Sequence, residues 1–504
     1  MKKIFITFLC AIMVMVFMPT MVFAAEEQTM TQEEFEQALV DGNGKVSLSN
    51  TVVTVDSTIS LVDKGEVEIT GVTFEAADTC KGKVLVAQGK TQLTLNDVAV
   101  IAGVGNSSAV YVGYKATLNA TDLVVDNSKA FEGGAIIVNR EASADFNGSL
   151  SMILGETSWY GLNVDNAKAD LTGASVTLTN AQKTQSAVCL DNETGDKGQA
   201  KGLTLTQVDT KDGQTAYVAD ENLAQFVEAK DAEGKDVKTI TLNKDVTLTA
   251  NLYLQADTKV VGNGKAINGS AAIGKDNVVT VMGEKVSIEN VTIRTCDVNK
   301  SALHVYKTTG TVLKDVTLDA SQTAGGAGMV VNASTVTVEG ELNLITGENT
   351  WGGINVDTAN GGAAVTFADG STVALNGNED VPAIYQDSND KQTTDAVVEG
   401  AEEAGLVQNA DGSYAVKEEV TEDPGQNPGT GENPGTGENP GTGENPADDE
   451  KDPVDEQKPV DEEKSDDEVV KTADANDMLP WLALMAVMAI GVVLTAVKSK
   501  KREN

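Results

Sequence analysis

The stretch Gly155-Glu-Thr-Ser-Trp-Tyr-Gly-Leu-Asn-Val-Asp165 returns later in the chain as Gly347-Glu-Asn-Thr-Trp-Gly-Gly-Ile-Asn-Val-Asp357. The two segments start 192 residues apart (347 − 155). A match of this length is not expected by chance, so the body of the chain is predicted to be a tandem duplication. We expect the first copy at residues 25–219 and the second copy at residues 220–419.

A shorter repeat runs inside each copy and consists of a small residue followed by alternating aliphatic residues. It starts at Ala109, Ala135, Gly161 and Ala187, at intervals of 26 residues, and again at Ala302, Gly328, Gly353 and Ala383. A fixed period of this size is typical of a solenoid. Each period holds about three short strand-like segments, which in one period are Ala109–Val112, Ala116–Leu118 and Leu123–Val125.

Three strands per fixed period favour an all-β fold, a parallel β-helix in which each turn stacks on the next. An array of β-sandwiches is the alternative, but it would not keep this period. In the coil, alternate residues should point into the bore. We therefore expect Ala109 and Tyr111 to point outward, and the inward set to include Val110, Val112, Ile136, Val138, Leu162 and Val164.

Two short helices are expected to cap the coil, because an open solenoid end exposes unpaired strand edges. Thr31-Gln-Glu-Glu34 forms a capping-box motif, and Phe35, Ala38 and Leu39 give the segment after it an apolar stripe. A similar segment surrounds Leu223, Phe226 and Val227. The pair of helices favours two β-helix domains over one continuous rod.

The two ends of the chain carry targeting signals. Residues 1–24 have the basic start, apolar stretch and small-residue cleavage site of a secretory signal peptide. Residues 478–497 are free of charge and long enough for one transmembrane helix, and the basic residues 498–504 are expected in the cytoplasm. Residues 420–474 are rich in Pro, Gly and acidic residues, which predicts a disordered stalk.

The segment before the apolar span resembles the cell-wall sorting signals of Gram-positive surface proteins, whose common form is Leu-Pro-x-Thr-Gly. Thr472 corresponds to the threonine that a sortase attacks, Ala473 replaces the glycine, and Val469-Val470 replace Leu-Pro. The resemblance implies a single-pass protein on the extracellular face of the membrane. Attachment to the cell wall then depends on whether a sortase accepts this degenerate motif.

Charge and cysteine content exclude several functions. The formal net charge is −39, from 76 acidic and 37 basic residues, so binding of nucleic acid through its phosphates is excluded. Three cysteines, Cys80, Cys189 and Cys296, remain after the signal peptide and do not occupy matching positions in the two copies. This pattern argues against a disulfide framework and against a zinc site. No cofactor is expected.

The segment Thr239–Leu248, followed by Val260–Ile267, resembles the opening of pectate-lyase-like β-helix domains in bacterial surface proteins. The resemblance implies a right-handed coil and an extracellular role that is adhesive or concerned with carbohydrate. Lyases of this class use carboxylates for Ca²⁺ and a basic residue for catalysis. Arg140 could occupy such a position, but Ala333 replaces it in the second copy, so a structural role is favoured.

Aspartates follow the first strand of several periods, namely Asp165, Asp191, Asp357 and Asp387. Carboxylates on adjacent turns are candidate catalytic acids of a glycoside hydrolase. Asp and Asn at strand ends also bond their own backbone in turns, and this interpretation is favoured. Weak Ca²⁺ binding is compatible with the same carboxylates, although no Ca²⁺-loop motif is present.

Aromatic residues provide the main binding hypothesis. Trp159 and Trp351 occupy equivalent positions beside small residues, where an outward ring could stack on a sugar. Tyr160, Tyr111 and Tyr385 could extend this surface. The alternative is that each tryptophan packs under a loop. His304, without a second histidine nearby, and Cys189 are expected outward and without a catalytic or metal-binding role.

The leading hypothesis is a cell-surface adhesin whose β-helix binds an extracellular carbohydrate or glycoprotein. The first alternative is a polysaccharide lyase or glycoside hydrolase that uses the four aspartates. The second is a structural spacer that binds nothing.

Overall fold

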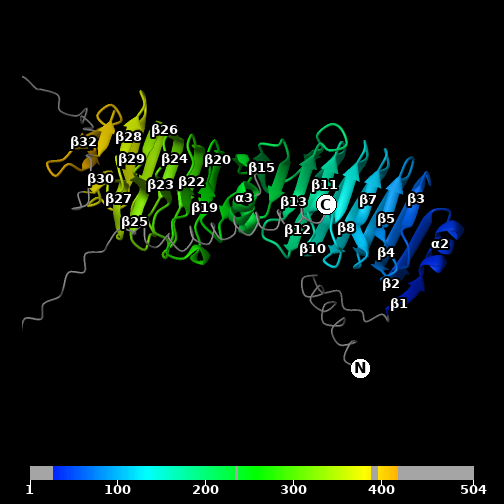
Figure 1. The fold of residues 1–504 in the computed structure, drawn as a ribbon. Coiled ribbons are helices and arrows are strands. Elements are labelled where there is room, and N and C mark those ends of the chain that lie inside the picture. Colours follow the sequence, from blue (N-terminus) through cyan, green and yellow to red (C-terminus); the bar gives the residue numbers. More distant parts are fainter. Residues whose placement is uncertain (1–26, 233–235, 388–395, 418–504) are drawn as a thin grey trace, which may run out of the picture. The chain divides into compact units, whose positions relative to one another are not determined.

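The computed structural model describes residues 27–232, 236–387 and 396–417 (Figure 1). In these residues the backbone forms a parallel β-helix solenoid of about 14 turns with few helices, which confirms the all-β prediction. The right-handed sense of the coil and the tandem duplication stay predictions. The predicted signal peptide, transmembrane helix and cytoplasmic tail, and Thr472 and Ala473 in the stalk, lie outside the described residues. Within the described ranges, no helix combines the length and apolarity that a membrane span requires.

One sheet runs along the first half of the coil and consists mainly of long parallel strands. In hydrogen-bonded order these are β1 (Gln28–Thr31), β2 (Lys45–Val55), β4 (Glu66–Ala76), β6 (Gln92–Ile101), β8 (Thr117–Asn127), β10 (Ser143–Leu154), β12 (Lys168–Asn180) and β14 (Gln199–Lys201). Adjacent strands are about one period apart in sequence, as in the pairing of Leu118 with Ala144.

A second sheet begins in the first half with shorter parallel strands. These are β3 (Ile59–Val62), β5 (Gly82–Gln88), β7 (Asn106–Gly113), β9 (Ile136–Asn139), β11 (Tyr160–Asp165) and β13 (Ser186–Asp191). Antiparallel strands then join the two halves, in the order β16 (Thr215–Val218), β15 (Thr206–Thr210) and β17 (Val237–Thr241).

Beyond β17 this sheet returns to parallel pairing. Its remaining strands are β18 (Val246–Thr247), β20 (Lys259–Asn268), β22 (Ser287–Arg294), β24 (Thr311–Asp319), β26 (Thr335–Ile345), β28 (Ala364–Phe367), β29 (Thr372–Asn376) and β31 (Val397–Glu399). The short strands of the first half are therefore in one sheet with the long strands of the second half.

A third sheet carries the short strands of the second half. Its parallel members are β19 (Leu252–Leu254), β21 (Val279–Val281), β23 (Leu303–Tyr306), β25 (Gly326–Asn332), β27 (Thr350–Asp357) and β30 (Ile384–Asp387). An antiparallel pair, β33 (Tyr414–Val416) and β32 (Leu406–Gln408), completes the sheet.

Aliphatic side chains stack in register along the bore. Val110, Ile136, Leu162 and Val188 are paired on four successive turns, and all are fully buried. Val112, Val138 and Val164 form a second buried column. The inward positions expected from the sequence are thereby confirmed. The buried apolar residues fall into two clusters, one from Phe35 to Tyr217 and one from Val208 to Leu406. The boundary at residue 219 stays a prediction.

The small residue that opens each repeat was predicted to point outward, and this prediction was wrong. Ala109 is fully buried in the first cluster, as are Ala135 and Ala187. The reason is visible at Gly161, where an ideal Cβ would lie 2.8 Å from Sδ of Met152 and 2.5 Å from the carbonyl oxygen of Ala187. The small residue therefore faces the core, where only a hydrogen atom or a methyl group fits.

The expected three strands per period are observed as two in the turn that starts at Ala109. The segments around Leu118 and Leu123 form a single bent strand, β8, because Asp122 adopts a left-handed conformation (φ +55°) inside it. The Asp122 carboxylate accepts a hydrogen bond from the backbone N–H of Ser149 on the next turn, at 2.9 Å. Asp315 makes the equivalent bond to Glu341 in the second half, at 3.1 Å.

Both predicted helices are present. Helix α2 (Gln32–Asp41) starts at the expected capping box, in which Thr31 and Glu34 exchange side-chain to backbone hydrogen bonds. Its Phe35 packs edge-on against Phe74 with ring centroids 5.0 Å apart. Helix α3 (Leu223–Ala232) buries Leu223, Phe226 and Val227 in the second cluster. Two single-turn helices, η2 (Asp220–Asn222) and η3 (Ala271–Ile273), complete the inventory of described helices.

The position of Gly161 leads to a stability test. Replacing it with leucine adds apolar surface but should lower the free energy of unfolding by about 1–3 kcal/mol, because the added atoms overlap Met152 and the backbone. Thr177→Leu, at an exposed position of β12, serves as the matched control and should change little. Urea unfolding followed by circular dichroism measures both. Equal stability of Gly161→Leu and the wild type would contradict the inward placement.

Candidate functional site

Both tryptophans that the sequence singled out are exposed to solvent. The exposed fraction of the side chain is 55% for Trp159 and 40% for Trp351. Trp159 lies just before β11, and its backbone N–H donates to the carbonyl oxygen of Gly133 at 2.9 Å. Trp351 lies in β27 opposite a register shift between Gly326 and Ala327. Neither ring is packed under a loop, so the alternative explanation for these residues is wrong.

Glycines on the preceding turns make room for the rings. Tyr160 stands edge-on to Trp159, with ring centroids 6.1 Å apart and planes at 69°. An ideal Cβ on Gly134 would lie 2.7 Å from the Tyr160 ring, so the ring occupies the space above that glycine. Burial, and then the nearby Cys189 and acidic groups, raise the pKa of Tyr160, which therefore remains a neutral hydroxyl.

The second tryptophan has its own aromatic neighbour on the next turn. Tyr385 follows Ile384 in β30, is 39% exposed and pairs with Asn355 of β27. Its Cβ would lie 3.0 Å from an ideal Cβ on Gly352, which is adjacent to Trp351 in the chain. Trp351 and Tyr385 therefore lie on neighbouring strands inside the third sheet, and both are exposed.

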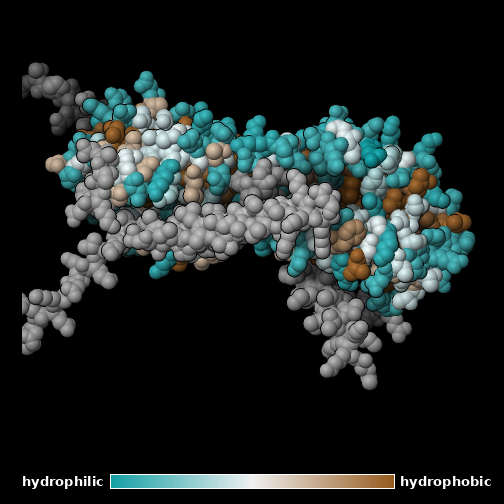
Figure 2. Space-filling model, viewed as in Figure 1, coloured by the Kyte–Doolittle hydropathy of each residue, from teal (hydrophilic) through white to brown (hydrophobic). Residues whose placement is uncertain are grey.

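The two aromatic pairs belong to different sheets. The β11 strand that follows Trp159 is linked through β13, β16, β15 and β17 to the long strands of the second half. Trp351 lies instead in the third sheet. The sequence suggested a single platform with several members, whereas the topology produces two separate surfaces. Figure 2 shows hydrophilic residues over most of the visible described surface, with apolar residues in small patches.

The four candidate acids bond within the chain. Thr194 donates its backbone N–H to both carboxylate oxygens of Asp165, at 2.9 and 3.1 Å. Asp191 accepts from the backbone of Asn192 at 2.8 Å, and Asp357 from that of Ala359 at 2.8 Å. The local bonds of Asp191 and Asp357 fit the turn role that the sequence favoured, whereas the bonds to Asp165 come from the next turn of the coil.

Burial limits what these acids can do chemically. Asp357 and Asp387 pair in register on adjacent turns, and both are buried. Burial raises the pKa of Asp357, and the nearby Asp387 adds to the effect, while the bond from Ala359 opposes it. Asn332 also donates its side-chain amide to Asp357. Within the part of the chain that the structure describes, no group of three or more His, Cys, Asp or Glu side chains is arranged to hold a metal ion.

Tyr111 points away from the bore, as expected, but only 8% of it is accessible to solvent. It lines a surface depression of about 410 Å³ with residues of β5, β7, β9 and the turns that follow them. Arg140 also lines this depression, and its Nη1 donates to the hydroxyl of Tyr114 at 2.6 Å. Sequence reasoning missed Lys83, Gln88, Tyr114 and Asn139, although Tyr114 precedes Arg140 by one period (140 − 114 = 26).

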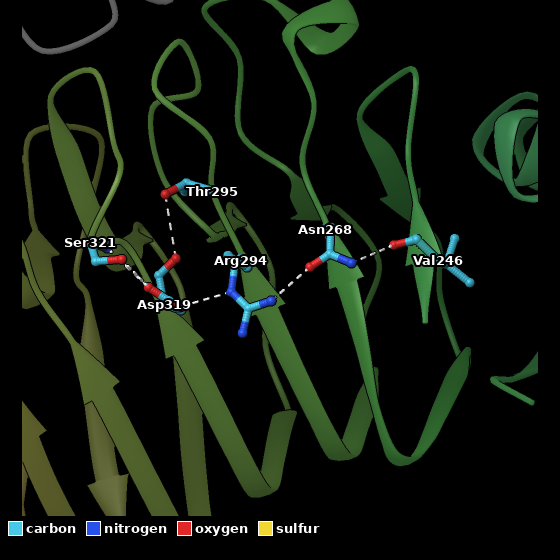
Figure 3. A network of polar contacts seen from close by, with 6 residues as sticks. All are labelled: Val246, Asn268, Arg294, Thr295, Asp319 and Ser321. Carbon is cyan, nitrogen blue, oxygen red and sulfur yellow. Dashed lines mark hydrogen bonds and ion pairs between the residues drawn. The ribbon is translucent and has the colours of Figure 1, made fainter. Parts of the chain in front are cut away.

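The other arginine of the coil, Arg294, lies in a polar network on the second sheet (Figure 3). Its Nε donates to Asp319 at 2.8 Å and its Nη1 to Asn268 at 3.0 Å. These three residues are paired in register at the ends of β20, β22 and β24. Asp319 also accepts from the hydroxyl of Ser321 at 2.6 Å. The network ties three turns together.

The surroundings of His304 and of the three cysteines indicate structural roles for these residues. Nδ1 of His304 lies 3.3 Å from the side-chain nitrogen of Asn277, and its ring tilts against Tyr306 with centroids 5.4 Å apart. Burial lowers the pKa of His304 to about 4, an effect that Asp276 partly opposes. Cys189 was expected outward but is buried. Cys80, Cys189 and Cys296 are free thiols.

Comparison with known proteins yields fold likeness only. No family model and no curated protein sequence matches the chain. The A-module of the mannuronan C-5 epimerase AlgE6 from Azotobacter vinelandii is similar at 11% identity and a TM-score of 0.18, covering 71% of this chain and 94% of that one. The catalytic domain of a GH87 alpha-1,3-glucanase in complex with nigerose is similar at 11% identity and a TM-score of 0.20, covering 76% and 69%.

The chain thus has structural neighbours that are carbohydrate-active β-helix enzymes. At these identities and TM-scores the likeness concerns the β-helix alone. It transfers no active site, substrate or activity to this chain.

The single histidine of the chain permits a direct titration. The imidazole of His304 should titrate near pH 4, well below the usual value of about 6.5, because burial disfavours its charged form. The unfolded chain then takes up this proton first as the pH falls. Stability should therefore be lost between about pH 6.5 and pH 4. Proton NMR of the imidazole measures the pKa, and a midpoint near 6.5 would contradict the buried placement.

The Arg294 network predicts a second dependence on pH. Burial works to raise the pKa of Asp319, but bonds from Ser321 and Arg294 outweigh it, so the pKa lies below its ordinary value. The resulting stabilisation is present above about pH 3.9 and is lost as the pH falls through the lowered value. Arg294→Ala should cost about 1 kcal/mol at pH 7 and less in acid.

Urea unfolding at pH 7 and pH 3 tests this expectation. Lys45→Ala removes an exposed ion pair with Glu68 and is the matched control, for which no measurable loss is expected. A loss for Arg294→Ala that is equal at both pH values would show that its charge does not stabilise Asp319.

Proposed function

We propose that this chain is a cell-surface binding protein of adhesin type, whose β-helix binds carbohydrate or glycoprotein ligands. The observation that carries the proposal is the exposure of Trp159 and Trp351 at equivalent positions beside glycines. Tryptophan is a large apolar side chain, and an exposed ring at a repeated position is unfavourable for stability alone. Stacking against a sugar ring would remove this apolar surface from water.

A tyrosine lies near the tryptophan at each proposed site. Tyr160 supports Trp159 edge-on, and Tyr385 lies beside the strand of Trp351. Each tyrosine also offers a hydroxyl that can bond to a sugar hydroxyl. Two separated sites on one chain would give avidity for a ligand with repeated units, because the second contact becomes intramolecular.

The proposed location follows from the sequence at both ends. A signal peptide at residues 1–24 would direct secretion, and residues 478–497 would hold the protein in the membrane. The stalk at residues 420–474 would then place the β-helix away from the membrane. Where a sortase accepts Thr472 and Ala473, the chain would instead be attached to the cell wall.

Replacement of the tryptophans tests the proposal. Trp159→Ala and Trp351→Ala should each weaken binding of the full chain to a responsive ligand by roughly 30-fold, since truncating a central tryptophan typically costs about 2 kcal/mol. The fold should be unaffected because both rings are exposed. Val40→Ala, at an exposed position of α2, is the control. Glycan and glycoprotein arrays, with simultaneous detection of released products, measure the outcome.

The same assay separates the alternatives. Product release that is abolished by Asp357→Asn would favour a lyase or hydrolase and overturn the adhesin. Absence of both binding and release across a broad panel would favour the structural spacer. Retained affinity in both tryptophan variants would exclude the aromatic surfaces as the binding sites.

A further inference from the structure

The depression beside Arg140 has an unusual charge for this chain. Its lining residues are Lys83, Val86, Gln88, Tyr111, Tyr114, Ile137, Asn139 and Arg140. Two of them are cationic and none is acidic, although the chain as a whole has a formal net charge of −39. In a strongly acidic protein, a depression whose charged lining residues are all cationic is a place where an anion can bind.

The turn-to-turn register builds the floor of the depression. Val86, Tyr111 and Ile137 are paired on three successive turns and point away from the bore. The Tyr111 ring lies over Gly113, where an ideal Cβ would be 2.7 Å from its hydroxyl oxygen. Gln88 and Asn139 line the depression together with this ring. Any larger residue at position 113 would displace this ring.

One wall comes from a repeated turn. Tyr114 and Arg140 follow β7 and β9 on successive turns, and both adopt left-handed backbone conformations, with φ of +53° and +55°. The backbone therefore turns at the same place on both turns of the coil, and the two side chains come into contact. The Arg140 guanidinium carbon lies 4.7 Å from the centre of the Tyr114 ring. This stacking holds the planar guanidinium in place.

Both cations contact aromatic rings instead of carboxylates. Nζ of Lys83 lies 5.4 Å from the centre of the Tyr111 ring. Among the described residues, neither Lys83 nor Arg140 forms an ion pair with an acidic side chain. Lys115, which follows Tyr114 directly, is instead paired with Glu141 at 3.4 Å. The charges of Lys83 and Arg140 are left for a ligand.

We propose that this depression binds a terminal acidic sugar that carries one carboxylate, as at the end of a sialylated glycan. The free edge of the Arg140 guanidinium and the Lys83 ammonium would donate hydrogen bonds to the carboxylate. Gln88, Asn139 and the tyrosine hydroxyls would bond to sugar hydroxyl and amide groups. The apolar faces of Val86, Ile137 and Tyr111 would contact the ring. This composition, with a mostly apolar floor and a few convergent polar groups, is typical of small-ligand sites.

The negative net charge of the protein favours a ligand with one negative charge over a ligand with many. A terminal sugar brings one negative charge to a local cationic site. A long polyanion would bring many charges close to the surrounding acidic surface and be repelled. The site uses neither tryptophan, so its failure and the failure of the aromatic surfaces can be told apart.

Calorimetry of the full chain with 3′-sialyllactose tests the proposal, with lactose as the ligand that lacks only the acidic sugar. We expect binding of sialyllactose that is reduced roughly 10- to 100-fold by Arg140→Gln and by Lys83→Gln, as for loss of a charged hydrogen bond. Lys115→Gln removes an equal charge just outside the depression and should leave the affinity unchanged. Binding should weaken as salt is raised, because the charges are partly exposed.

Three outcomes would overturn the proposal. These are equal affinity for lactose and sialyllactose, unchanged affinity in both Arg140→Gln and Lys83→Gln, and tighter binding of polygalacturonate than of sialyllactose. Thermal unfolding by circular dichroism checks that each variant is folded. Should Arg140→Gln unfold, Gly113→Leu provides a second test, since it displaces the Tyr111 ring and leaves both cations in place, and it should also abolish binding. Loss of affinity in Trp159→Ala alone would assign the ligand to the aromatic surface instead.

Discussion

The stacking of aliphatic side chains from turn to turn is the interaction on which this structure depends. Val110, Ile136, Leu162 and Val188 are paired on successive turns and fully buried. One turn cannot bury its apolar face alone, so its stability comes from the turns before and after it. A shift of register by one residue would move every aliphatic side chain from the bore to the solvent. The period of 26 residues that runs from Ala109 to Ala187 is the sequence trace of this constraint.

The register that stacks the core also assembles the outer surface. Residues one period apart become neighbours, so Tyr114 meets Arg140, and Val86, Tyr111 and Ile137 form one floor. Glycines at particular turns then decide which rings can lie flat, as Gly113 does for Tyr111 and Gly134 for Tyr160. A solenoid can therefore build a binding surface from residues that are chemically ordinary in the linear chain. In a chain with a formal net charge of −39, a depression lined by two cations and no acidic residue is distinctive.

The failures of sequence reasoning have specific physical causes. Alternation placed Ala109 outward, but the register of β7 shifts just before this residue, and its side chain is fully buried in the core. The segments at Leu118 and Leu123 were expected as separate strands, but they form one strand whose pairing skips only the left-handed residue Asp122 between them. Tyr111 points outward as expected, but its ring lies over Gly113 and is almost completely covered. None of these depends on periodicity, so periodicity could not predict them.

The residue pattern alone predicts the class of fold, the inward columns, both short helices and the two exposed tryptophans. It could do so because burial in a stacked coil imposes a period that is visible in the residues themselves. The fold separates the two tryptophans, because the strand after Trp159 and the strand of Trp351 belong to different sheets and antiparallel strands between the halves link the first of these sheets to the long strands of the second half. The tertiary structure also brings Lys83, Tyr111, Tyr114 and Arg140 together in one depression. Their meeting depends on backbone register and left-handed turns, which are three-dimensional relations that a linear pattern does not contain.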